Sequence, residues 1–450
     1  MARAASLSGF PEWLPADRIV EERVIDLLKH TFELNGFAAV HTRAMEPIAA
    51  LAKDGEIDKE VFAVSRLHGD GSDAKSPLGL HFDLTVPFAR YVVENAGQLA
   101  FPFKRYQIQP VWRGERPQDG RFREFIQADI DVVGEDELAD HFEVEVPLVM
   151  AQAFDRLSEL GVPPVRILAN DRRLIEGFAR GAGLTDVPAV LRAIDKLDKI
   201  GEEKVAALLA AEAGADARQQ ELCLALARIE SPDASFADEV RALGVTHPLL
   251  EEGLASLVRL LEAAHRRAPG TVWAQLKIAR GLDYYTGAVY ETQLIGHEGL
   301  GSVASGGRYD ALASTGKRTY PGVGMSLGVS RLMSRLVGAS RMVEATRPVP
   351  TAVLVAVSTE EDRPASDAVA EALRARGIPA DVAPAAAKFG RQIRFADRRG
   401  IPFVWFPDGE SGHEVKDIRS GAQVSADPQV WTPPAEDVWP RVEQLAPAGD

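Results

Sequence analysis

Apolar residues recur at helical spacing in several stretches of the chain. In residues 17–36 they return every three or four positions and stop at a glycine, which predicts an amphipathic helix. Residues 138–160 show the same periodicity, and residues 78–94 predict a turn that leads into a helix. Ala, Leu, Arg and Glu dominate residues 170–268, which indicates an inserted module of amphipathic helices.

Strand patterns lie on both sides of this helical module. Residues 104–134 contain two alternating runs joined by the turn-rich loop RPQDGR, which predicts an antiparallel hairpin with a long polar loop. Further strand patterns occupy residues 37–46, 272–295 and 301–312, and in residues 322–336 a strand runs into a helix.

The last hundred residues follow a different order. Residues 345–350 read as a linker, and residues 351–406 then alternate strand, helix, strand, helix, strand. This order predicts a small α/β unit with a partly parallel sheet. The final twenty or so residues are rich in Pro and Ala, which predicts a loosely packed helix and a frayed tail.

Composition narrows the class of protein. With 450 residues the chain exceeds the roughly 100–200 residues of one domain, so we expect two or three. The sequence shows neither a secretory signal nor a stretch long and apolar enough for a membrane helix. Its one cysteine, Cys223, rules out an intramolecular disulfide, which is consistent with a reducing cytoplasm. We expect Cys223 to be a small core residue that takes no part in chemistry. The net charge of −15 does not exclude a nucleic-acid partner, because phosphate contacts depend on local positive charge.

Several familiar chemistries are excluded by missing motifs. The sequence has no G-x-x-x-x-G-K-[ST] loop, so any use of ATP is not of the P-loop type. It also has no Cys and His cluster with metal spacing and no G-x-S-x-G elbow.

The predicted hairpin carries the strongest candidate chemistry. Arg113 ends its first strand, Arg121 and Arg123 lie in the loop, and Phe125 begins the second strand. Guanidinium groups bind phosphate oxygens in pairs, and a phenyl ring offers a face on which a base can stack. A surface hairpin with solvated charges is the alternative.

Three further peptides are weaker signals by themselves. They are G-V-G-M-S-L-G-V-S-R, which ends at Arg331, ARGLDYYTG, which begins at Ala279, and SGGRYD, which begins at Ser305. Glycines in strands permit close approach of a ligand or a backbone, but packing explains many of them. The tyrosines line a polar pocket or serve as core aromatics.

Together these peptides resemble a known family. RGERPQDGRFREF resembles motif 2 of class II aminoacyl-tRNA synthetases, and GVGMSLGVSRL resembles their motif 3. ARGLDYYTG and SGGRYD resemble the two signature peptides of the histidyl-tRNA synthetase family, and LHFDLTVPFAR resembles its amino-acid-binding segment. KFGRQIRFADRRGIPFVWF and VKDIRSGAQ resemble its C-terminal anticodon-binding domain, so the resemblance covers nearly the whole chain.

The resemblance implies an α+β fold. An antiparallel-sheet catalytic core would comprise residues 1–169 and 269–344, with a helical insertion domain at 170–268 and an α/β anticodon-binding domain at 351–450. It also implies a homodimer that activates L-histidine with ATP and Mg²⁺ and transfers the histidyl group to the 3′ end of tRNA(His). The metal would be held mainly by the ATP phosphates.

Roles for individual residues follow from the same resemblance. Arg113 and Arg280 would be catalytic, at the α-phosphate. ATP would be bound by Arg113, Glu115, Arg121, Phe125 and Arg331. Histidine would be bound by Asp83, Thr85, Arg113, Gln127, Asp131, Arg280, Tyr284, Tyr285 and Tyr309. Asp129 alternates with Gln127 and Asp131 on one face of a strand, so it stays open as a participant. Anticodon phosphates would meet Lys388, Arg391, Arg394 and Arg398, for which a solvated helix face is the alternative.

Three positions depart from the family pattern. Arg43 stands in motif 1 where a proline is usual, His81 replaces an arginine, and Ser330 replaces the glutamate before the motif 3 arginine. Other readings are a non-catalytic regulatory subunit of ATP phosphoribosyltransferase, a class II synthetase for another amino acid, and a tRNA sensor. The ATP-site arginines, the tyrosine peptides and the C-terminal domain disfavour them.

Overall fold

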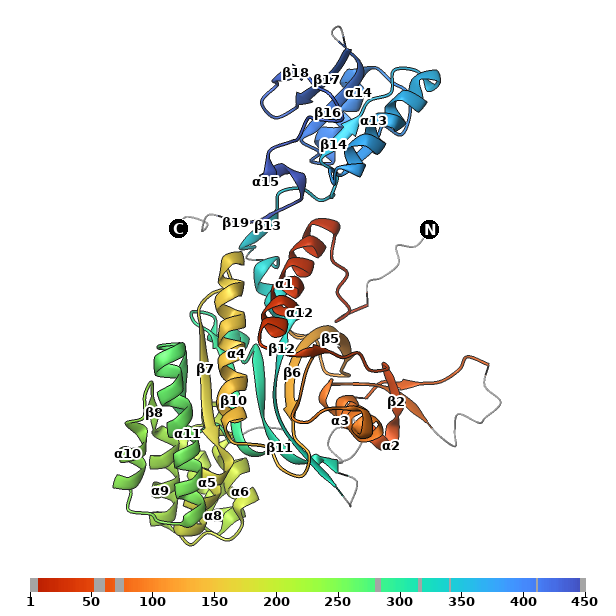
Figure 1. The fold of residues 1–450 in the computed structure, drawn as a ribbon. Coiled ribbons are helices and arrows are strands. Elements are labelled where there is room, and N and C mark those ends of the chain that lie inside the picture. Colours follow the sequence, from red (N-terminus) through yellow and green to blue (C-terminus); the bar gives the residue numbers. More distant parts are fainter. Residues whose placement is uncertain are drawn as a thin grey trace. The chain divides into compact units, whose positions relative to one another are not determined.

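The computed structural model describes residues 7–51, 61–68, 77–279, 285–314, 318–339, 341–409 and 412–445. By its contacts the chain divides into two compact units (Figure 1). One comprises Met1–Pro11 and Ile25–Arg335, and the other comprises Glu12–Val24 and Leu336–Asp450. Within the described residues, no helix is both long and apolar enough to cross a membrane.

A nine-stranded sheet forms the centre of the first unit, in the order β1-β5-β6-β12-β11-β10-β7-β9-β8. Only the β1–β5 and β7–β9 pairs are parallel, which confirms the expected antiparallel core. The strands are β1 (Ala38–Ala39), β5 (Phe103–Trp112), β6 (Glu124–Val133), β7 (Val165–Asp171), β8 (Glu230–Ser231), β9 (Val272–Gln275), β10 (Tyr285–Leu294), β11 (Ala304–Ser314) and β12 (Thr319–Gly328).

Helices and a small second sheet accompany the nine-stranded sheet, and two of the helices, α1 and α12, are each divided between the two units, after Val24 and after Arg335. Helix α4 packs against β6, β7 and β12, and α3 packs against β11. The three short strands are paired in the order β2-β4-β3. The bounds are α1 (Pro15–Leu34), β2 (Met45–Pro47), α2 (Ile48–Leu51), β3 (Ala63–Val64), β4 (Leu78–Leu80), α3 (Thr85–Asn95), α4 (His141–Leu157) and α12 (Val329–Leu336).

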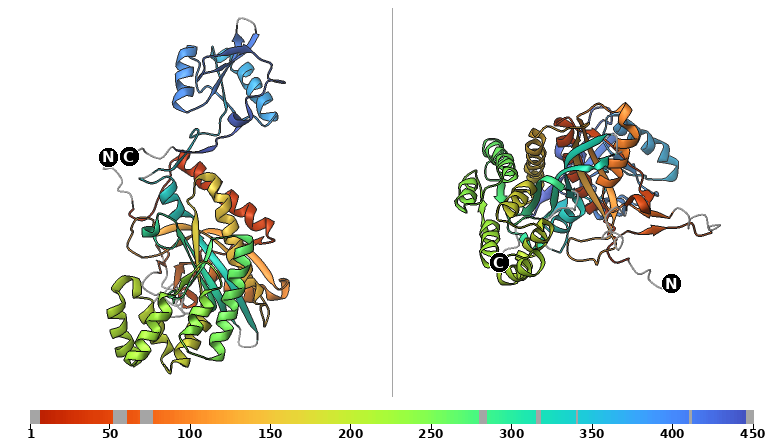
Figure 2. Two further views of the ribbon diagram at one scale, coloured as in Figure 1. Left: turned by 90° about the vertical axis from the view of Figure 1, so that its left-hand side faces the viewer. Right: turned by 90° about the horizontal axis from the view of Figure 1, so that it is seen from below.

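The segment expected to be helical contains a compact group of helices beside the β7–β9–β8 edge of the sheet (Figures 1 and 2). Helices α5 and α11 approach closely because a glycine stands at each contact. A Cβ on Gly177 would lie 2.1 Å from Leu250 N, and one on Gly253 would lie 2.3 Å from Leu174 N. Cys223 is buried here, and burial raises the pKa of its thiol to about 11. The thiol therefore stays protonated and unreactive, as expected for a core residue. The helices are α5 (Arg172–Gly181), α6 (Val187–Ile194), α7 (Leu197–Ile200), α8 (Glu202–Ala213), α9 (Ala217–Arg228), α10 (Phe236–Ala242) and α11 (Pro248–Arg267).

The second unit contains the predicted α/β arrangement. In its five-stranded sheet, β15-β14-β16-β17-β18, the first two pairs are parallel and the last two are antiparallel. Helices α13 and α14 cover opposite faces, because alternate residues of β14 enter the two hydrophobic clusters that contain them. The elements are β14 (Val353–Val355), α13 (Arg363–Ala375), β15 (Ala380–Val382), α14 (Phe389–Arg398), β16 (Phe403–Gly409), β17 (Gly412–Asp417) and β18 (Gln423–Ser425).

The expected linker and frayed tail are more ordered than the sequence pattern suggests. Strand β19 (Val442–Gln444) pairs with β13 (Val343–Ala345), after the short helix α15 (Ala435–Val438). In the linker, Arg347 is buried and donates hydrogen bonds to the carbonyl oxygens of Val349, Pro350 and Val438. The pairing of β19 with β13 therefore orders the tail, and the hydrogen bonds of the Arg347 guanidinium order the linker.

Candidate active site

The β5–β6 hairpin places the motif 2 side chains at one end of the sheet. Arg113 follows β5 directly, and its backbone N–H donates to the carbonyl of Arg123 at 2.8 Å. Its Nε donates to Phe82 O at 3.0 Å, and its guanidinium carbon lies 5.2 Å from the centre of the Phe125 ring. Arg113 thus contacts the segment before α3 on one side and the start of β6 on the other.

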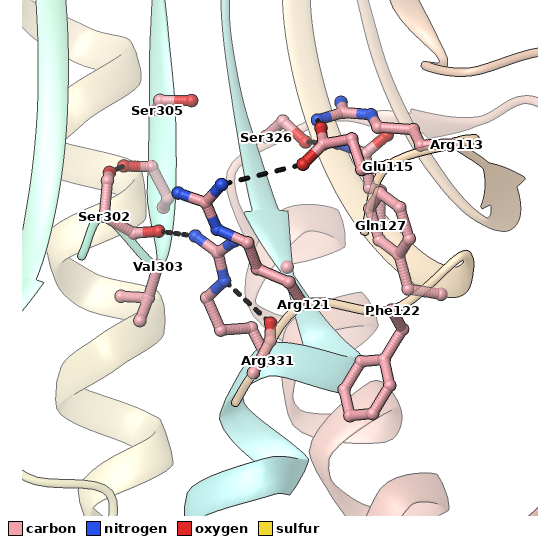
Figure 3. Close-up of a pocket in the computed structure, with 14 residues that line it drawn as sticks. Arg113, Glu115, Arg121, Phe122, Gln127, Ser302, Val303, Ser305, Ser326 and Arg331 are labelled. Atoms are coloured by element: carbon pink, nitrogen blue, oxygen red, sulfur yellow. Dashed lines mark hydrogen bonds and ion pairs between the residues drawn. The ribbon is translucent and has the colours of Figure 1, made fainter. Parts of the chain in front are cut away.

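A cleft of about 120 Å³ opens beside this hairpin (Figure 3). Arg331, from the first turn of α12, extends into it and donates to Gly120 O at 3.0 Å and to Ser302 O. Burial lowers the pKa of Arg331, and the nearby Arg121 and Arg113 add to that effect. The lining residues are Arg113, Glu115, Gly120, Arg121, Phe122, Phe125, Gln127, Ser302, Val303, Ala304, Ser305, Ser326, Gly328 and Arg331.

Positive charge exceeds negative charge in this cleft. Its three guanidinium groups face one carboxylate, Glu115, which lies 3.6 Å from Arg121 Nη1 and 3.9 Å from Arg113 Nη1. Gly120 keeps the loop close to the sheet, since a Cβ there would lie 2.4 Å from Leu300 Cδ1. A polyanion with a flat ring matches this combination of arginines and an aromatic face.

A second, smaller cavity lies next to the cleft and contains buried carboxylates. It is lined by Thr85, Asp129, Asp131, Tyr285, Ser305, Gly306, Gly307, Tyr309, Gly324, Met325 and Ser326. Asp131 Oδ2 lies 2.7 Å from Arg105 Nη2, and Asp131 Oδ1 accepts from Tyr309 Oη at 2.8 Å. Burial raises the pKa of Asp131 to about 7, although Arg105 opposes the shift.

Asp83 and Gln127 complete this polar region. Asp83 is fully enclosed just before α3, where its Oδ1 accepts from Val86 N at 3.2 Å. Burial raises the pKa of Asp83 to about 6, and Arg113 acts against that shift. Gln127 Nε2 donates to Ser326 Oγ at 2.9 Å. The two cavities share Ser305 and Ser326, so they are adjoining parts of one site.

Glycines on neighbouring strands make room for these side chains. A Cβ on Gly324 would lie 2.1 Å from Asp131 Oδ1, and one on Gly322 would lie 2.4 Å from the Tyr309 ring. A Cβ on Gly307 would lie 2.9 Å from the Tyr285 ring. The glycines of the motif 3 and SGGRYD peptides are therefore required by close approach of side chains.

Not all candidate residues come together in this site. Arg280 and Tyr284 lie outside the described residues. The four candidate tRNA-binding side chains belong to the second unit, where they are exposed on α14 and at its N-terminus. Within the part of the chain that the structure describes, none of the four has an ion pair. We call them the basic patch: Lys388, Arg391, Arg394 and Arg398.

The three departures from the family pattern have local partners. Arg43 pairs with the buried Glu46 at 2.7 Å. His81 Nε2 lies 2.9 Å from Pro110 O, its ring stacks on Trp112, and burial lowers its pKa. Ser330 Oγ accepts from the backbone N–H of Ile126 at 2.9 Å, which ties α12 to β6.

The sequence reasoning missed Arg105. Its side chain is fully buried, it packs over the Phe88 ring at 4.2 Å, and it faces Asp131 and Asp129 at 2.7 and 3.9 Å. The sequence does contain a pattern that indicates a polar strand face: Arg105 alternates with Gln107 and Gln109 inside a strand with many apolar neighbours.

Comparisons with known proteins agree with this geometry. A family model described as histidyl-tRNA synthetase matches residues 9–332, and one described as anticodon binding domain matches residues 351–425. The curated histidine–tRNA ligase of Micrococcus luteus is 60% identical, over 98% of this chain and 99% of that protein.

Solved structures give the same fold. The histidyl-tRNA synthetase of Nostoc sp. is 31% identical and superposes with a TM-score of 0.81, over 94% of this chain and 97% of that one. A Bacillus halodurans protein titled as an ATP phosphoribosyltransferase regulatory subunit/histidyl-tRNA synthetase is 18% identical, with a TM-score of 0.72 over 90% of this chain and 98% of that one. At that identity the likeness concerns the fold alone. From the match over most of its length and from the identity of its relatives, we conclude that the chain belongs to the histidyl-tRNA synthetase family.

Proposed function

We propose that this chain activates L-histidine with ATP, forming histidyl-adenylate and pyrophosphate, and then transfers the histidyl group to the 3′ end of tRNA(His). The observation that carries the proposal is the position of Arg113. It lies where the arginine-rich cleft meets the pocket of buried carboxylates, in contact with Phe82 next to Asp83 and with Phe125. A group in that position can hold an α-phosphate and an amino-acid carboxylate at once.

The first step joins these two ligands. A histidine carboxylate oxygen attacks the α-phosphorus, a new O–P bond forms, and the bond to the β-phosphate oxygen breaks, so that pyrophosphate leaves. Negative charge builds up on the α-phosphate oxygens, and fixed guanidinium groups stabilise it there. Arg113 performs this role together with Arg280. In the second step the terminal ribose hydroxyl of the tRNA attacks the carbonyl carbon, and AMP leaves.

The cleft supplies the ATP contacts. Phe125 and Arg331 hold the adenine between them, and the bonds of Arg331 to Gly120 O and Ser302 O keep its guanidinium in place. Glu115 accepts from the adenine amino group, and Arg121 binds the outer phosphates. Mg²⁺ would be held mainly by the ATP phosphates and would neutralise part of their charge, since Glu115 is the one acidic residue among those that line the cleft.

The carboxylate pocket supplies the histidine contacts. Asp83, Thr85 and Gln127 bind the ammonium group, and Asp131 and Tyr285 bind the imidazole, with Tyr309 beside them. Tyr284, outside the described residues, is carried over from the family resemblance as a further histidine-binding residue. Tyr309 and Arg105 orient Asp131 through its two oxygens. A buried site that pairs both ring nitrogens rejects amino acids without them by large factors.

The remaining proposals concern partners. The basic patch binds anticodon phosphates, because four exposed cations on one helix face form a surface that attracts a polyanion. The protein forms a homodimer and works in the cytoplasm, where tRNA and ATP are available. Light scattering on the purified protein tests the dimer.

Histidine-dependent exchange of labelled pyrophosphate into ATP, run with all twenty amino acids, tests the function. We expect exchange with histidine only, and charging of tRNA(His) when the tRNA is added. Arg113→Gln should lower the exchange rate by ~10²- to 10³-fold, the usual effect of losing one charge-stabilising donor. Arg180→Gln, which removes only an exposed pair with Glu176, is the matched control.

Absence of exchange in folded wild-type protein would overturn the proposal and favour a regulatory subunit. The arginines of the cleft speak against that alternative, because a subunit without adenylate chemistry has no need of three guanidinium groups beside a carboxylate pocket.

A further inference from the structure

Three buried acceptor atoms in and beside the smaller cavity, which we call the carboxylate pocket together with Asp83 and Gln127, lack a hydrogen-bond partner within the described residues: Asp83 Oδ2, Gln127 Oε1 and Asp129 Oδ1. A buried acceptor without a donor loses its water contacts and destabilises the fold by about 1–3 kcal/mol. Gln107 Oε1, on the register partner of Asp129, and the donors Arg105 Nε and Nη1 also lack a partner among the described residues. The acceptors that face the substrate cavities therefore indicate a ligand group that brings several donors.

Asp129 belongs to this group by its position. It lies between Gln127 and Asp131 on β6, and its register partner on β12 is Ser326, which also receives the Gln127 amide hydrogen bond. Asp129 is 2% exposed and lines the same cavity as Thr85 and Asp131. Burial is the main cause that raises the pKa of Asp83, and the charge of Asp129 adds to it.

Asp129 and Asp131, the two carboxylates on β6, have different hydrogen-bond partners, which indicates different roles. Asp131 uses one oxygen for Tyr309 and the other for Arg105 at 2.7 Å. Asp129 lies farther from Arg105, at 3.9 Å, and keeps one oxygen free of protein donors among the described residues. Burial raises the pKa of Asp129, while Arg105 and Ser326 favour its ionised form.

Charge counting points to the same ligand. Asp83, Asp129 and Asp131 are all enclosed, Arg105 is the one cation buried with them among the described residues, and Arg113 acts on Asp83 and Asp129 from the cleft. The three carboxyl groups thus face two guanidinium groups there. A ligand cation would reduce this excess of negative charge. An ammonium group has three N–H donors and no acceptor, which matches three acceptor atoms without donors.

We propose that Asp129 binds the α-ammonium group of the substrate amino acid, as a third acceptor beside Asp83 and Gln127. This assignment rests on the proposed function and adds a specificity-determining residue to it. Asp129 then selects for the amino group, whereas Asp131 selects for the imidazole.

Calorimetric titrations that measure the binding of three ligands distinguish recognition of the ammonium group from recognition of the imidazole. L-Histidine carries the ammonium, the imidazole and the carboxylate; histidinol lacks the carboxylate; 3-(imidazol-4-yl)propionate lacks the ammonium. Asp129→Asn should weaken histidine and histidinol by roughly 10- to 100-fold, the range for a hydrogen bond between charged groups. It should leave the propionate within about 2-fold of wild type. Asp131→Asn should weaken all three, and the exposed Asp238→Asn should change none.

Equal loss of the propionate in Asp129→Asn would overturn the assignment, because Asp129 would then act through Asp131 or through the fold. Unchanged histidine binding would overturn it as well. If the Asn variant does not fold, Asp129→Glu keeps the charge facing Arg105 but moves the carboxylate by one methylene. It should therefore still weaken histidine and histidinol more than the propionate, and equal effects on all three ligands would overturn the assignment. Wild-type pyrophosphate exchange stays a separate test, so failure of this assignment is distinguishable from failure of the proposed function.

Discussion

Gly324→Ala tests the geometry of the carboxylate pocket with the smallest possible change. The added Cβ would lie 2.1 Å from Asp131 Oδ1, 2.5 Å from Asp131 Cγ and 2.7 Å from the backbone oxygen of Ile130. The Ile130 oxygen belongs to the neighbouring strand β6 and cannot turn away. Relief therefore requires both a small shift of β12 away from the Ile130 oxygen and movement of the Asp131 carboxyl, whose Oδ1 is the atom that accepts from Tyr309.

The magnitude follows from these distances. Ordinary contact between nonbonded heavy atoms begins near ~3.5 Å, so the carboxyl has to move by more than about 1 Å. A misplacement of that size typically lowers turnover by about 10²-fold. Overpacking of a tight core destabilises a fold by about 1–3 kcal/mol. We therefore expect kcat/KM for histidine to fall by about 10²-fold while the protein stays folded.

Pyrophosphate exchange at saturating ATP measures kcat/KM for histidine, and thermal unfolding measures the loss of stability. Gly97→Ala is the matched control, since a Cβ there meets nothing within 4 Å. If folded Gly324→Ala protein keeps kcat/KM within about 3-fold of wild type, Asp131 is not held in a functional position by this close approach, and the reasoning is wrong.

Three further predictions concern the pocket, the patch and the sheet. Because burial raises the folded-state pKa of Asp83 to about 6 and that of Asp131 to about 7, the ligand-free folded protein binds more protons than the unfolded chain between about pH 4 and 7. These two groups therefore lower the free energy of unfolding as pH rises through that window, by about 3 kcal/mol for Asp83 and about 4 kcal/mol for Asp131. Urea unfolding should show a weaker decline in Asp131→Asn, and an identical decline in both proteins would contradict this. Replacing the whole basic patch by Gln should weaken tRNA binding and flatten its dependence on salt concentration, with pyrophosphate exchange unchanged; an unaltered salt slope would remove the patch from the tRNA interface. Ser330→Ala leaves the Ile126 N–H without its acceptor and should reduce the free energy of unfolding by about 1–3 kcal/mol, which chemical denaturation measures; a loss below about 0.3 kcal/mol would show that the bond is dispensable.

The family peptides predicted most of the candidate site residues, because each peptide keeps its chemistry within a short segment. Arg113 and Phe125 stand at the ends of two predicted strands, and the structure places them there. Arg105 escaped notice because its function depends on partners in other segments: Asp131 lies 26 positions away on β6, and Phe88 belongs to α3. The sequence of a strand does not show whether a charged side chain faces solvent or a buried carboxylate.

The local pattern of the chain determined where helices and strands form, since amphipathic periodicity and turn residues act over a few positions. It also determined the order of the α/β unit and the helical character of residues 170–268. Only the tertiary structure decided that the tail residues of β19 pair with β13, about a hundred positions earlier, and that glycines of one strand make room for carboxylates of the next. Pairing across long sequence separations and close packing depend on which surfaces meet, and no local sequence pattern specifies that.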